Sequence, residues 1–377
     1  MRLCLQAFAR RVIICSMSEP EPSTMGARLQ DIAEKLKVST STVSRALGEQ
    51  TSKRVRPELR SRIVEVARAM NYVPHPAAQL MRKPKTHLIT ALLPLRLESF
   101  SSEYFGTILS GVVGASREWE TEIRVALIDP TDVDVMQQMG RIAIGAGGIL
   151  YMANPLSVRQ LMNLEDLMRP IVVMASSVPP QINLSEVGVS TVAMDNLMGA
   201  YEITRMLLKL GHRRLAMING PDGLRDPAER QQGFVKAMTE YRVPVDHHGI
   251  VHVPFAFEGG VRGWEQLKQH SYRPTAVVCG NDEIAVGLLE TLAKDQINCP
   301  RDISVVGFDD SRLAPRVYPP LTTVHQPTAE MGRGAVELLA TGFRNPNSKA
   351  TVEHRVFPAE VVNRQSVAPP RAVQTHG

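Results

Sequence analysis

Cysteine and tryptophan are scarce in this chain of 377 residues, which contains four Cys and two Trp. No two cysteines have the Cys-x-x-Cys spacing of a zinc or redox site, so we expect reduced thiols in a cytoplasmic protein. Cys279 lies within an apolar run and is interpreted as a buried strand residue. These absences exclude a small disulfide-rich secreted domain and a site built from paired thiolates.

The common catalytic motifs are also missing. The chain has no Gly-x-Ser-x-Gly, no His-Glu-x-x-His and no Gly-x-x-x-x-Gly-Lys. The glycine-rich stretch 145–148 precedes an apolar run, whereas a dinucleotide-binding loop follows a strand. The ten histidines are scattered along the chain. We therefore expect a protein that is not an enzyme and that needs neither a metal nor a cofactor.

No apolar run has the length and composition of a membrane span. The apolar stretch 1–17 is too short and is interrupted by Arg10 and Arg11, which also makes it a poor signal peptide. We interpret residues 1–26 as a disordered extension, or as the product of a start codon assigned upstream of Met17 or Met25. No membrane partner is expected.

Positive charge is concentrated in one part of the chain. Residues 27–86 carry 13 Lys or Arg against five Asp or Glu, whereas residues 87–377 carry 27 against 31. A basic segment on a mildly acidic body is typical of a phosphate-binding module. The plainer interpretation is a basic surface that only faces solvent, but such a surface does not require the positive charge to be concentrated in one segment of the chain.

Two short helices joined by a tight turn are predicted at the start of the basic segment. Residues 29–36 carry Ile32, Ala33 and Leu36 on one face, and residues 38–47 supply a facing apolar stripe. Ser39 is the candidate N-cap of the second helix, because its hydroxyl can accept a hydrogen bond from a free backbone amide. Such a pair fits the major groove of DNA.

The outer surface of the second helix is polar. It carries four short hydroxyl side chains and one arginine, namely Thr40, Ser41, Thr42, Ser44 and Arg45. Hydroxyls reach phosphates or base edges, and Arg reads guanine O6 and N7 through two hydrogen bonds, so Thr40, Ser41 and Arg45 are our candidates for base contact. An ordinary solvated helix, rich in Ser and Thr, is the alternative.

A third helix is expected to begin at Arg56-Pro57-Glu58, where Pro fits the first turn. It presents apolar residues at helical spacing: Leu59, Ile63, Val66, Ala67 and Met70. Residues 71–76 then break the helix, and residues 77–82 have helical propensity. We predict a three-helix headpiece followed by a linker that can change between a disordered and an ordered, helical state.

Beyond residue 86, short apolar runs alternate with amphipathic segments. The candidate strands are 88–93, 124–128, 148–152, 171–174, 215–218, 276–279 and 303–307. The candidate helices are 104–119, 196–210, 229–241 and 282–296. The alternation indicates an α/β protein with parallel sheets covered by helices on both faces, and the strands are too many for one small sheet.

Short phrases in a fixed order run through most of the chain. In the basic segment they are Asp31-Ile-Ala, Val38-Ser, Thr42-Val-Ser-Arg-Ala-Leu, Asn71-Tyr-Val-Pro and Ala78-Gln-Leu-Met. In the body they are Leu210-Gly-His-Arg-Arg-Leu-Ala, Gly280-Asn-Asp, Asp302-Ile-Ser-Val-Val-Gly-Phe-Asp-Asp and Pro319-Pro-Leu-Thr-Thr. By these phrases, residues 27–365 resemble the LacI/GalR family of bacterial transcription regulators.

The resemblance implies a helix-turn-helix headpiece at 27–73, a hinge at 74–86, an effector-binding and dimerisation domain at 87–365 and a tail at 366–377. It also implies two doubly wound parallel-sheet subdomains of periplasmic-binding-protein type, connected by three crossovers. The first would comprise residues 87–190 and 327–345, and the second residues 191–325 and 346–365. The effector would lie between them.

The resemblance places the effector contacts at Arg230, Asn281, Asp309 and Gln326, with an apolar wall at Phe105 and Phe255. Ligands of doubly wound sheets bind beyond the carboxyl ends of the strands, where several of these residues stand. An arginine opposed by a carboxylate fits a small polyhydroxylated ligand, and it also fits the carboxylate of a sugar acid. The plainer role of an Asp or Asn at such a place is to cap a helix, and Asp282 is expected to cap the helix it begins.

Three positions depart from the pattern of the family. Lys37 replaces the usual turn glycine, with a modest cost if the backbone there needs a positive φ. Met81 replaces the leucine that wedges into the minor groove at the operator centre, a role that Met can also fill. Ala175 lies near a position where some sugar-binding members carry an acidic residue, which leaves the identity of the sugar open.

The expected protein is a cytoplasmic homodimer that represses catabolic genes from a palindromic double-stranded operator under the control of a sugar or sugar acid. A dimer is expected because two headpieces must match two half-sites. The tail lacks apolar heptads, so it does not predict a tetramerisation helix. Two alternatives stay open, a small-molecule binding protein with a vestigial headpiece and a DNA-binding regulator controlled by a protein co-repressor.

Overall fold

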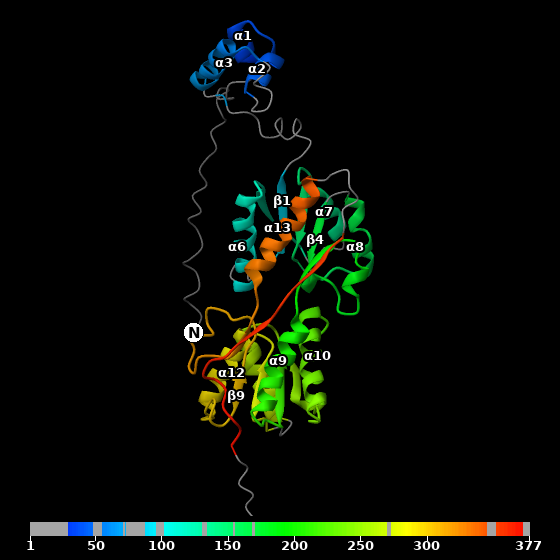
Figure 1. Cartoon of the computed structure of the whole chain (residues 1–377), viewed down its shortest axis with the longest axis vertical. Helices are drawn as coiled ribbons and strands as arrows, with labels where there is room; N and C mark the ends of the chain where they lie inside the picture. Colours follow the sequence, from blue (N-terminus) through cyan, green and yellow to red (C-terminus); the bar gives the residue numbers. More distant parts are fainter. Residues whose placement is uncertain are drawn as a thin grey trace, which may run out of the picture. The chain divides into compact units, whose positions relative to one another are not determined.

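The computed structural model describes residues 29–47, 55–70, 72, 87–95, 102–129, 134–153, 155–167, 170–269, 273–344 and 352–371. The chain divides into two compact units, residues 1–84 and 85–377 (Figure 1). The predictions for residues 1–26, for the hinge at 74–86 and for Met81 lie outside the described residues. Within the described parts, no helix is both long and apolar enough to cross a membrane.

The first unit is a headpiece of three helices, α1 (Leu29–Leu36), α2 (Thr40–Leu47) and α3 (Pro57–Ala69). Each helix contributes two buried apolar side chains to a common core: Ile32, Ala33, Val43, Ala46, Ile63 and Ala67. These side chains are at most 6% exposed, although the three helices are short. The predicted three-helix headpiece is therefore confirmed, and it rests on this small core.

The turn between α1 and α2 has the predicted geometry. The Ser39 Oγ accepts a hydrogen bond from the Thr42 backbone amide at 3.1 Å, so Ser39 is the N-cap of α2. Lys37 has a φ of 51°, in the left-handed region, and the next amide, of Val38, donates to Ala33 O at 3.0 Å. The position thus needs a positive φ, which Lys adopts at a cost that glycine would avoid.

Two lobes make up the second unit. The first lobe contains a six-stranded parallel sheet in the order β11-β5-β4-β3-β1-β2. In chain order its strands are β1 (Leu88–Pro94), β2 (Glu122–Ile128), β3 (Gly148–Tyr151), β4 (Ile171–Met174), β5 (Ser190–Met194) and β11 (His354–Phe357). Its helices are α6 (Glu103–Glu118), α7 (Val135–Ile142), α8 (Val158–Met162) and α13 (Thr328–Arg344).

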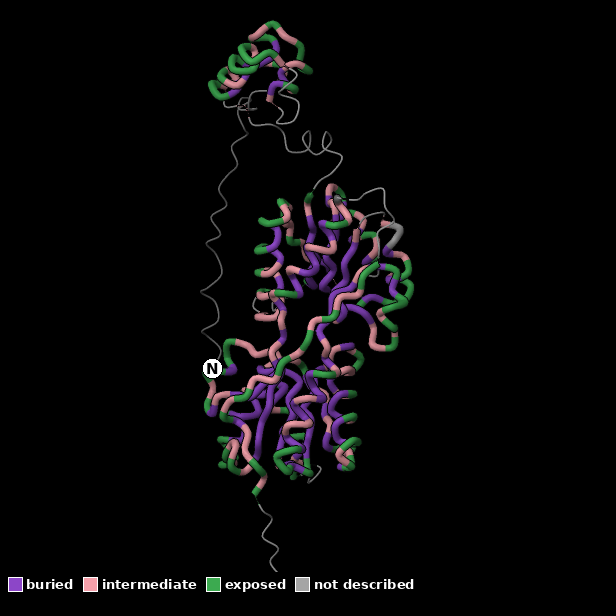
Figure 2. The backbone as a smooth tube through the Cα atoms, in the orientation of Figure 1, coloured by how far each residue is buried: buried purple, intermediate pink, exposed green. Residues whose placement is uncertain are grey.

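Alternate residues of these strands enter two different cores, which shows that helices cover both faces of the sheet. Ala91 and Leu150 pack in a core with residues of α6 and α13, whereas Leu92, Ile149 and Tyr151 pack with residues of α7 and α8. Strands buried on both faces appear as continuous purple segments in Figure 2. Continuous apolar runs are the sequence pattern of such strands.

The second lobe repeats this arrangement around a four-stranded parallel sheet in the order β7-β6-β8-β9. Its strands are β6 (Leu215–Asn219), β7 (Ile250–His252), β8 (Ala276–Cys279) and β9 (Ser304–Val306). Helices α9 (Asn196–Lys209) and α10 (Arg225–Glu240) cover one face, and α11 (Phe257–Gln269) and α12 (Asp282–Lys294) cover the other. Cys279 is a buried residue of β8, as predicted.

The chain passes three times between the lobes, at Asp195, at Gln326–Pro327 and at Pro358–Ala359. Strands β10 (Thr323–His325) and β12 (Glu360–Val362) pair antiparallel beside two of these crossovers. The predicted subdomain boundaries need correction, because β5 and β11 belong to the sheet of the first lobe and not to the second lobe. A boundary at 190/191 divides β5, whose residues pair with β4 and β11 throughout.

The tail also begins later than predicted. Ser366 and Ala368 are tied to β9, since Val305 N donates to Ser366 O at 2.9 Å and Ala368 N donates to Ser304 Oγ at 3.0 Å. Ser366 is fully buried. Residues 366–368 are therefore part of the second lobe, although their sequence is too short to show a strand pattern.

Helices α6 and α13 of the first lobe approach each other closely at Gly111. A Cβ atom at this position would lie 1.9 Å from Ala329 O, whereas a Cβ at Gly106, on the same helix, meets nothing within 4 Å. We expect Gly111→Ala to lower the free energy of unfolding by about 1–3 kcal/mol, because the backbones must separate. Gly106→Ala is the matched control and should be neutral or slightly stabilising. Equal effects of the two substitutions in denaturant titrations would contradict this packing.

Candidate functional site

The predicted DNA-contact residues of α2 lie on one polar surface. Thr40, Ser41 and Arg45 are exposed, and Thr42 and Ser44 are half-buried. Ser39 Oγ lies 2.8 Å from both Ser41 Oγ and Thr42 Oγ1, and Arg45 Nε donates to Ser41 O at 3.2 Å. The surface is accessible to a partner, and its contact with DNA stays a prediction.

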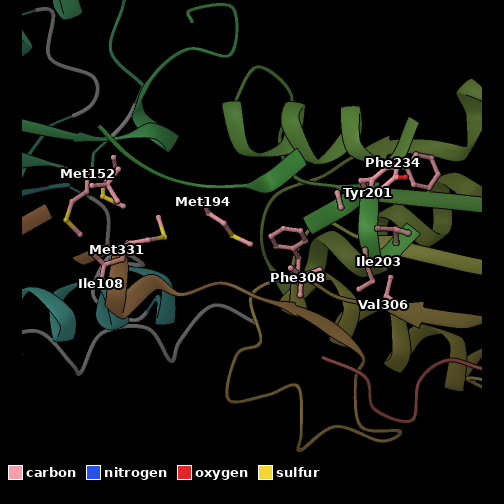
Figure 3. Packing of buried hydrophobic residues seen from close by; sticks show 14 of the residues in the cluster. Ile108, Met152, Met194, Tyr201, Ile203, Phe234, Val306, Phe308 and Met331 are labelled. Carbon is pink, nitrogen blue, oxygen red and sulfur yellow. The ribbon is translucent and has the colours of Figure 1, made fainter. Parts of the chain in front are cut away.

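A small cavity lies between the lobes, with a volume of about 10 Å³. It is lined by Tyr104, Met174, Ala175, Ser176, Val192, Ala193, Met194, Asn196, Asp226, Gln326 and Met331. Figure 3 shows Met194 and Met331 between Ile108 of the first lobe and Phe308 of the second. The cavity has room for about one water molecule, so the structure is a closed form in which side chains fill the cleft.

Arg230 is a buried cation of the second lobe that contacts the cavity-lining residue Asn196. Its side chain is only 4% exposed; Nε donates to Asn196 Oδ1 at 2.8 Å and Nη1 donates to Gly280 O. The guanidinium carbon lies 3.8 Å from the ring centre of Phe308 and 5.8 Å from that of Phe255. Arg230 is in the second turn of α10, which begins at Arg225 and not near Glu229 as the sequence suggested.

Asp309 faces this arginine. Its Oδ1 lies 4.0 Å from Arg230 Nη2 and accepts a hydrogen bond from Gln326 Nε2 at 3.4 Å. Burial raises the pKa of Asp309 to about 8, against the opposing effect of Arg230. The φ of Asp309 is 120°, a strained value of the kind that concentrates at binding sites. The sequence therefore brings Arg230, Asp309, Gln326 and Phe255 into one neighbourhood.

The remaining predicted effector residues have structural partners. The Asn281 side chain accepts a hydrogen bond from Ile284 N at 2.9 Å, so Asn281, and not Asp282, is the N-cap of α12. Asp282 instead accepts from Thr323 Oγ1 at 2.6 Å and from Ser311 N at 2.7 Å. The cap uses the carboxamide oxygen of Asn281, and its Nδ2 is the group with which Asn281 can donate to a ligand.

Phe105 is half-buried and packs at a ring-centre distance of 5.3 Å, edge to face, against Tyr104. It is Tyr104 that lines the cavity, together with Ser176, Asn196 and Asp226, and none of these four was predicted from the sequence as an effector contact. A signal existed for two of them, because Asn196 directly follows a strand and crossover, and Asp226 lies in the first turn of the helix after β6. Ala175, singled out as a departure from the family pattern, does line the cavity.

Two polar bridges connect the lobes. The buried Arg225 of α10 donates from Nε to Val178 O at 3.1 Å and from Nη2 to Pro179 O at 2.8 Å, in the first lobe. The Glu103 carboxylate of α6 accepts from the Arg312 backbone amide at 3.0 Å. These contacts join the two lobes in the arrangement that the structure shows.

The raised pKa of Asp309 makes stability depend on pH. The folded protein holds this proton up to about pH 8, whereas an ordinary Asp releases it at 3.8. Between these values the folded state binds more protons than the unfolded chain, so the free energy of unfolding falls as the pH rises. We expect Asp309→Asn to reduce this fall between pH 6.5 and 8 in denaturant titrations. Parallel pH profiles for the two proteins would contradict a raised pKa at Asp309.

The chain matches two sequence families. Bacterial regulatory proteins of the lacI family match residues 28–75, and a periplasmic binding protein-like domain matches residues 204–367. The Ribose operon repressor of Haemophilus influenzae is 30% identical over 85% of this chain and 93% of that protein. The HTH-type transcriptional repressor CytR of Escherichia coli K12 is 31% identical over 83% of this chain and 89% of that protein.

Solved structures share the fold over nearly the whole chain. The Lac repressor dimer bound to operator and the anti-inducer ONPF has a TM-score of 0.77 at 21% identity, covering 91% of this chain and 99% of that one. The complex of the transcriptional regulator CelR with cellobiose has a TM-score of 0.66 at 25% identity, covering 90% and 99%. These findings confirm the predicted fold class, a helix-turn-helix headpiece with two parallel-sheet lobes of periplasmic-binding-protein type. The chain belongs to the lacI family of bacterial transcription regulators, which bind DNA and are not enzymes.

Proposed function

We propose that this protein represses catabolic genes from a palindromic operator, and that a small polyhydroxylated effector, a sugar or sugar acid, controls it from the cleft between the lobes. The observation that carries the proposal is the pair formed by Arg230 and Asp309, 4.0 Å apart beside Phe255 and Phe308. A cation and a carboxylate against aromatic faces suit a ligand with many hydroxyl groups and an apolar ring face.

Names of similar proteins support a sugar as the effector. A relative is named for the ribose operon, one similar structure contains cellobiose, and a LacI family regulator from Enterococcus faecium contains ribose. The DNA partner is supported by the exposed hydroxyls and arginine of α2 and by the basic charge of residues 27–86. A dimer is supported by the similar Lac repressor dimer on its operator, since a palindrome presents two half-sites.

The mechanism follows from the closed cleft. A cavity of about 10 Å³ cannot hold a sugar, so the lobes must separate for the ligand to enter and then close around it in an altered geometry. The first lobe directly follows the hinge in sequence, so its position in each half of a dimer sets the spacing of the headpieces. A coupling of about 1–3 kcal/mol would change operator affinity ~5- to 150-fold.

The experiment that tests the DNA-binding part is selection of duplexes from a random library by the full-length protein at physiological salt. We expect enrichment of a palindromic site, with an affinity that falls steeply as salt increases, because phosphate contacts release counterions. Failure to enrich any sequence, even with metabolite pools added, would support a binding protein with a vestigial headpiece instead.

A further inference from the structure

The charged groups of the cleft indicate which of the two effector classes it accepts. Of the 11 described residues that line the cavity, Asp226 is the one with a formal charge, and the set contains no Lys, Arg or His. The Asp226 Oδ1 accepts a hydrogen bond from Asn196 Nδ2 at 3.2 Å. Its second oxygen, Oδ2, accepts none from the described residues, so it can accept one from a ligand.

The two nearest guanidinium groups are already engaged. Arg230 donates to Asn196 and to Gly280 O, and its remaining terminal nitrogen lies 4.0 Å from Asp309 Oδ1. Arg225 spans the lobes to the backbone carbonyls of Val178 and Pro179 and forms an ion pair with Glu229 at 2.8 Å. A bidentate grip on a ligand carboxylate needs two parallel N–H donors on one arginine, and neither Arg225 nor Arg230 is among the described residues that line the cavity.

Acidic groups outnumber basic ones around this network. Asp226 and Glu229 balance the charges of Arg225 and Arg230, and Asp309 adds a negative charge only as it ionises near its pKa of about 8, so the network offers a ligand no excess of positive charge. Burial raises the pKa of all three carboxyl groups, which shows that the two arginines do not fully compensate for their desolvation. A further buried negative charge from a ligand would therefore be unfavourable.

We propose that the cleft selects an uncharged polyhydroxyl effector over the corresponding sugar acid, and that Asp226 determines this specificity by accepting a hydrogen bond from a ligand hydroxyl. The inference rests on the proposed function, a sugar-class effector in this cleft. A neutral sugar brings the donors that Asp226 and Asp309 need. A carboxylate brings acceptors and a negative charge, for which the described residues that line the cavity supply no cation.

The test compares matched pairs of ligands on the full-length wild-type protein. The probes are D-glucose with D-glucuronate, D-galactose with D-galacturonate and D-ribose with D-ribonate, titrated calorimetrically at pH 7.5. We expect a neutral member to bind and its acid partner to bind at least about tenfold more weakly. An acid that binds as tightly as its neutral partner, or more tightly, overturns the inference and leaves the proposed sugar-class effector standing.

Two variants assign the selectivity to a residue. Asp226→Asn should weaken binding of the neutral sugar about tenfold and reduce the preference over its acid partner, because the amide is neutral and can donate to a carboxylate. Asp222→Asn is the matched control, since Asp222 is an exposed residue four positions earlier, in the loop that precedes α10. An unchanged preference in a folded Asp226→Asn protein contradicts the role of Asp226. The wild-type comparison decides the ligand class even if this variant does not fold.

Failure of the proposed function gives a different result from failure of the inference. If none of the six compounds binds to protein that still binds its selected operator, the sugar-class effector is wrong, and the inference about its charge is wrong with it. If an acid alone binds, only the charge preference is wrong.

Discussion

Replacing Arg45 by Ala is expected to lower the affinity of the full-length protein for its selected operator about 5- to 150-fold, a loss of ~1–3 kcal/mol. Arg45 is exposed on α2, and its Nε donates to Ser41 O, which directs the side chain along the polar surface of the helix. A side chain that reads a guanine contributes to specific binding and little to non-specific binding. The ratio of specific to non-specific affinity is therefore the quantity to measure.

Two matched variants separate base reading from charge. Arg45→Lys keeps the charge but loses the planar fork, so it should lose specificity nearly as Arg45→Ala does while keeping the salt dependence of binding. Arg68→Ala removes an equal charge from the exposed surface of α3 and should leave the selected sequence unchanged. A normal specificity ratio in Arg45→Ala protein would remove Arg45 from the DNA interface.

Replacing Arg230 by Met is expected to abolish the response to the effector and to destabilise the protein. The substitution removes the donor to Asn196 and leaves Asp309 without its counter-ion. Above pH 8, where Asp309 is ionised, loss of one member of a buried ion pair costs about 3–5 kcal/mol, and the 28% exposure of the Asp309 side chain lowers our expectation to ~2–3 kcal/mol. Operator binding without effector should persist, because the headpiece is a separate unit.

The double variant Arg230→Met/Asp309→Asn tests whether the unpaired Asp309 carboxylate causes the loss of stability. Removal of the unpaired carboxylate should restore part of the lost stability, measured by denaturant titration above pH 8, without restoring the effector response. Lys236→Met is the matched control, a cation on the exposed side of the same helix, and it should change stability by less than about 1 kcal/mol. If the double variant were less stable than Arg230→Met alone, Asp309 would not be an uncompensated charge.

The fold was predictable where local rules decide it. The apolar spacing of three short helices, the Ser39 cap and the positive φ at Lys37 all follow from residues close together in sequence. The strand pattern also predicted parallel sheets with too many strands for one small sheet, and the resemblance to the family implied that there are two. The crossovers were placed wrongly, because β5 and β11 are short segments whose sheet is decided by pairing with distant strands, and β11 also carries His354 and Arg355 in place of an apolar run. No local signal distinguishes the sheet of one lobe from that of the other.

The site was only partly predictable. The family pattern identified Arg230 and Asp309, and the structure places Arg230 Nη2 4.0 Å from Asp309 Oδ1. It did not identify Tyr104 and Asp226 as residues that line the cavity, or Arg225 as a bridge between the lobes, because these roles depend on how the two lobes meet. Contacts between lobes join residues more than 40 positions apart in the chain, such as Arg225 and Val178, and spacing in a sequence cannot show them.

The most direct test of an effector-controlled regulator is reciprocal coupling between its two sites. Operator affinity is measured with and without a bound sugar, and sugar affinity is measured with and without operator, on the same full-length protein. The account predicts that each ligand changes the affinity of the other by the same factor, within about 5- to 150-fold. Operator affinity that does not change at saturating sugar would contradict it and would leave a DNA-binding protein whose cleft has another use.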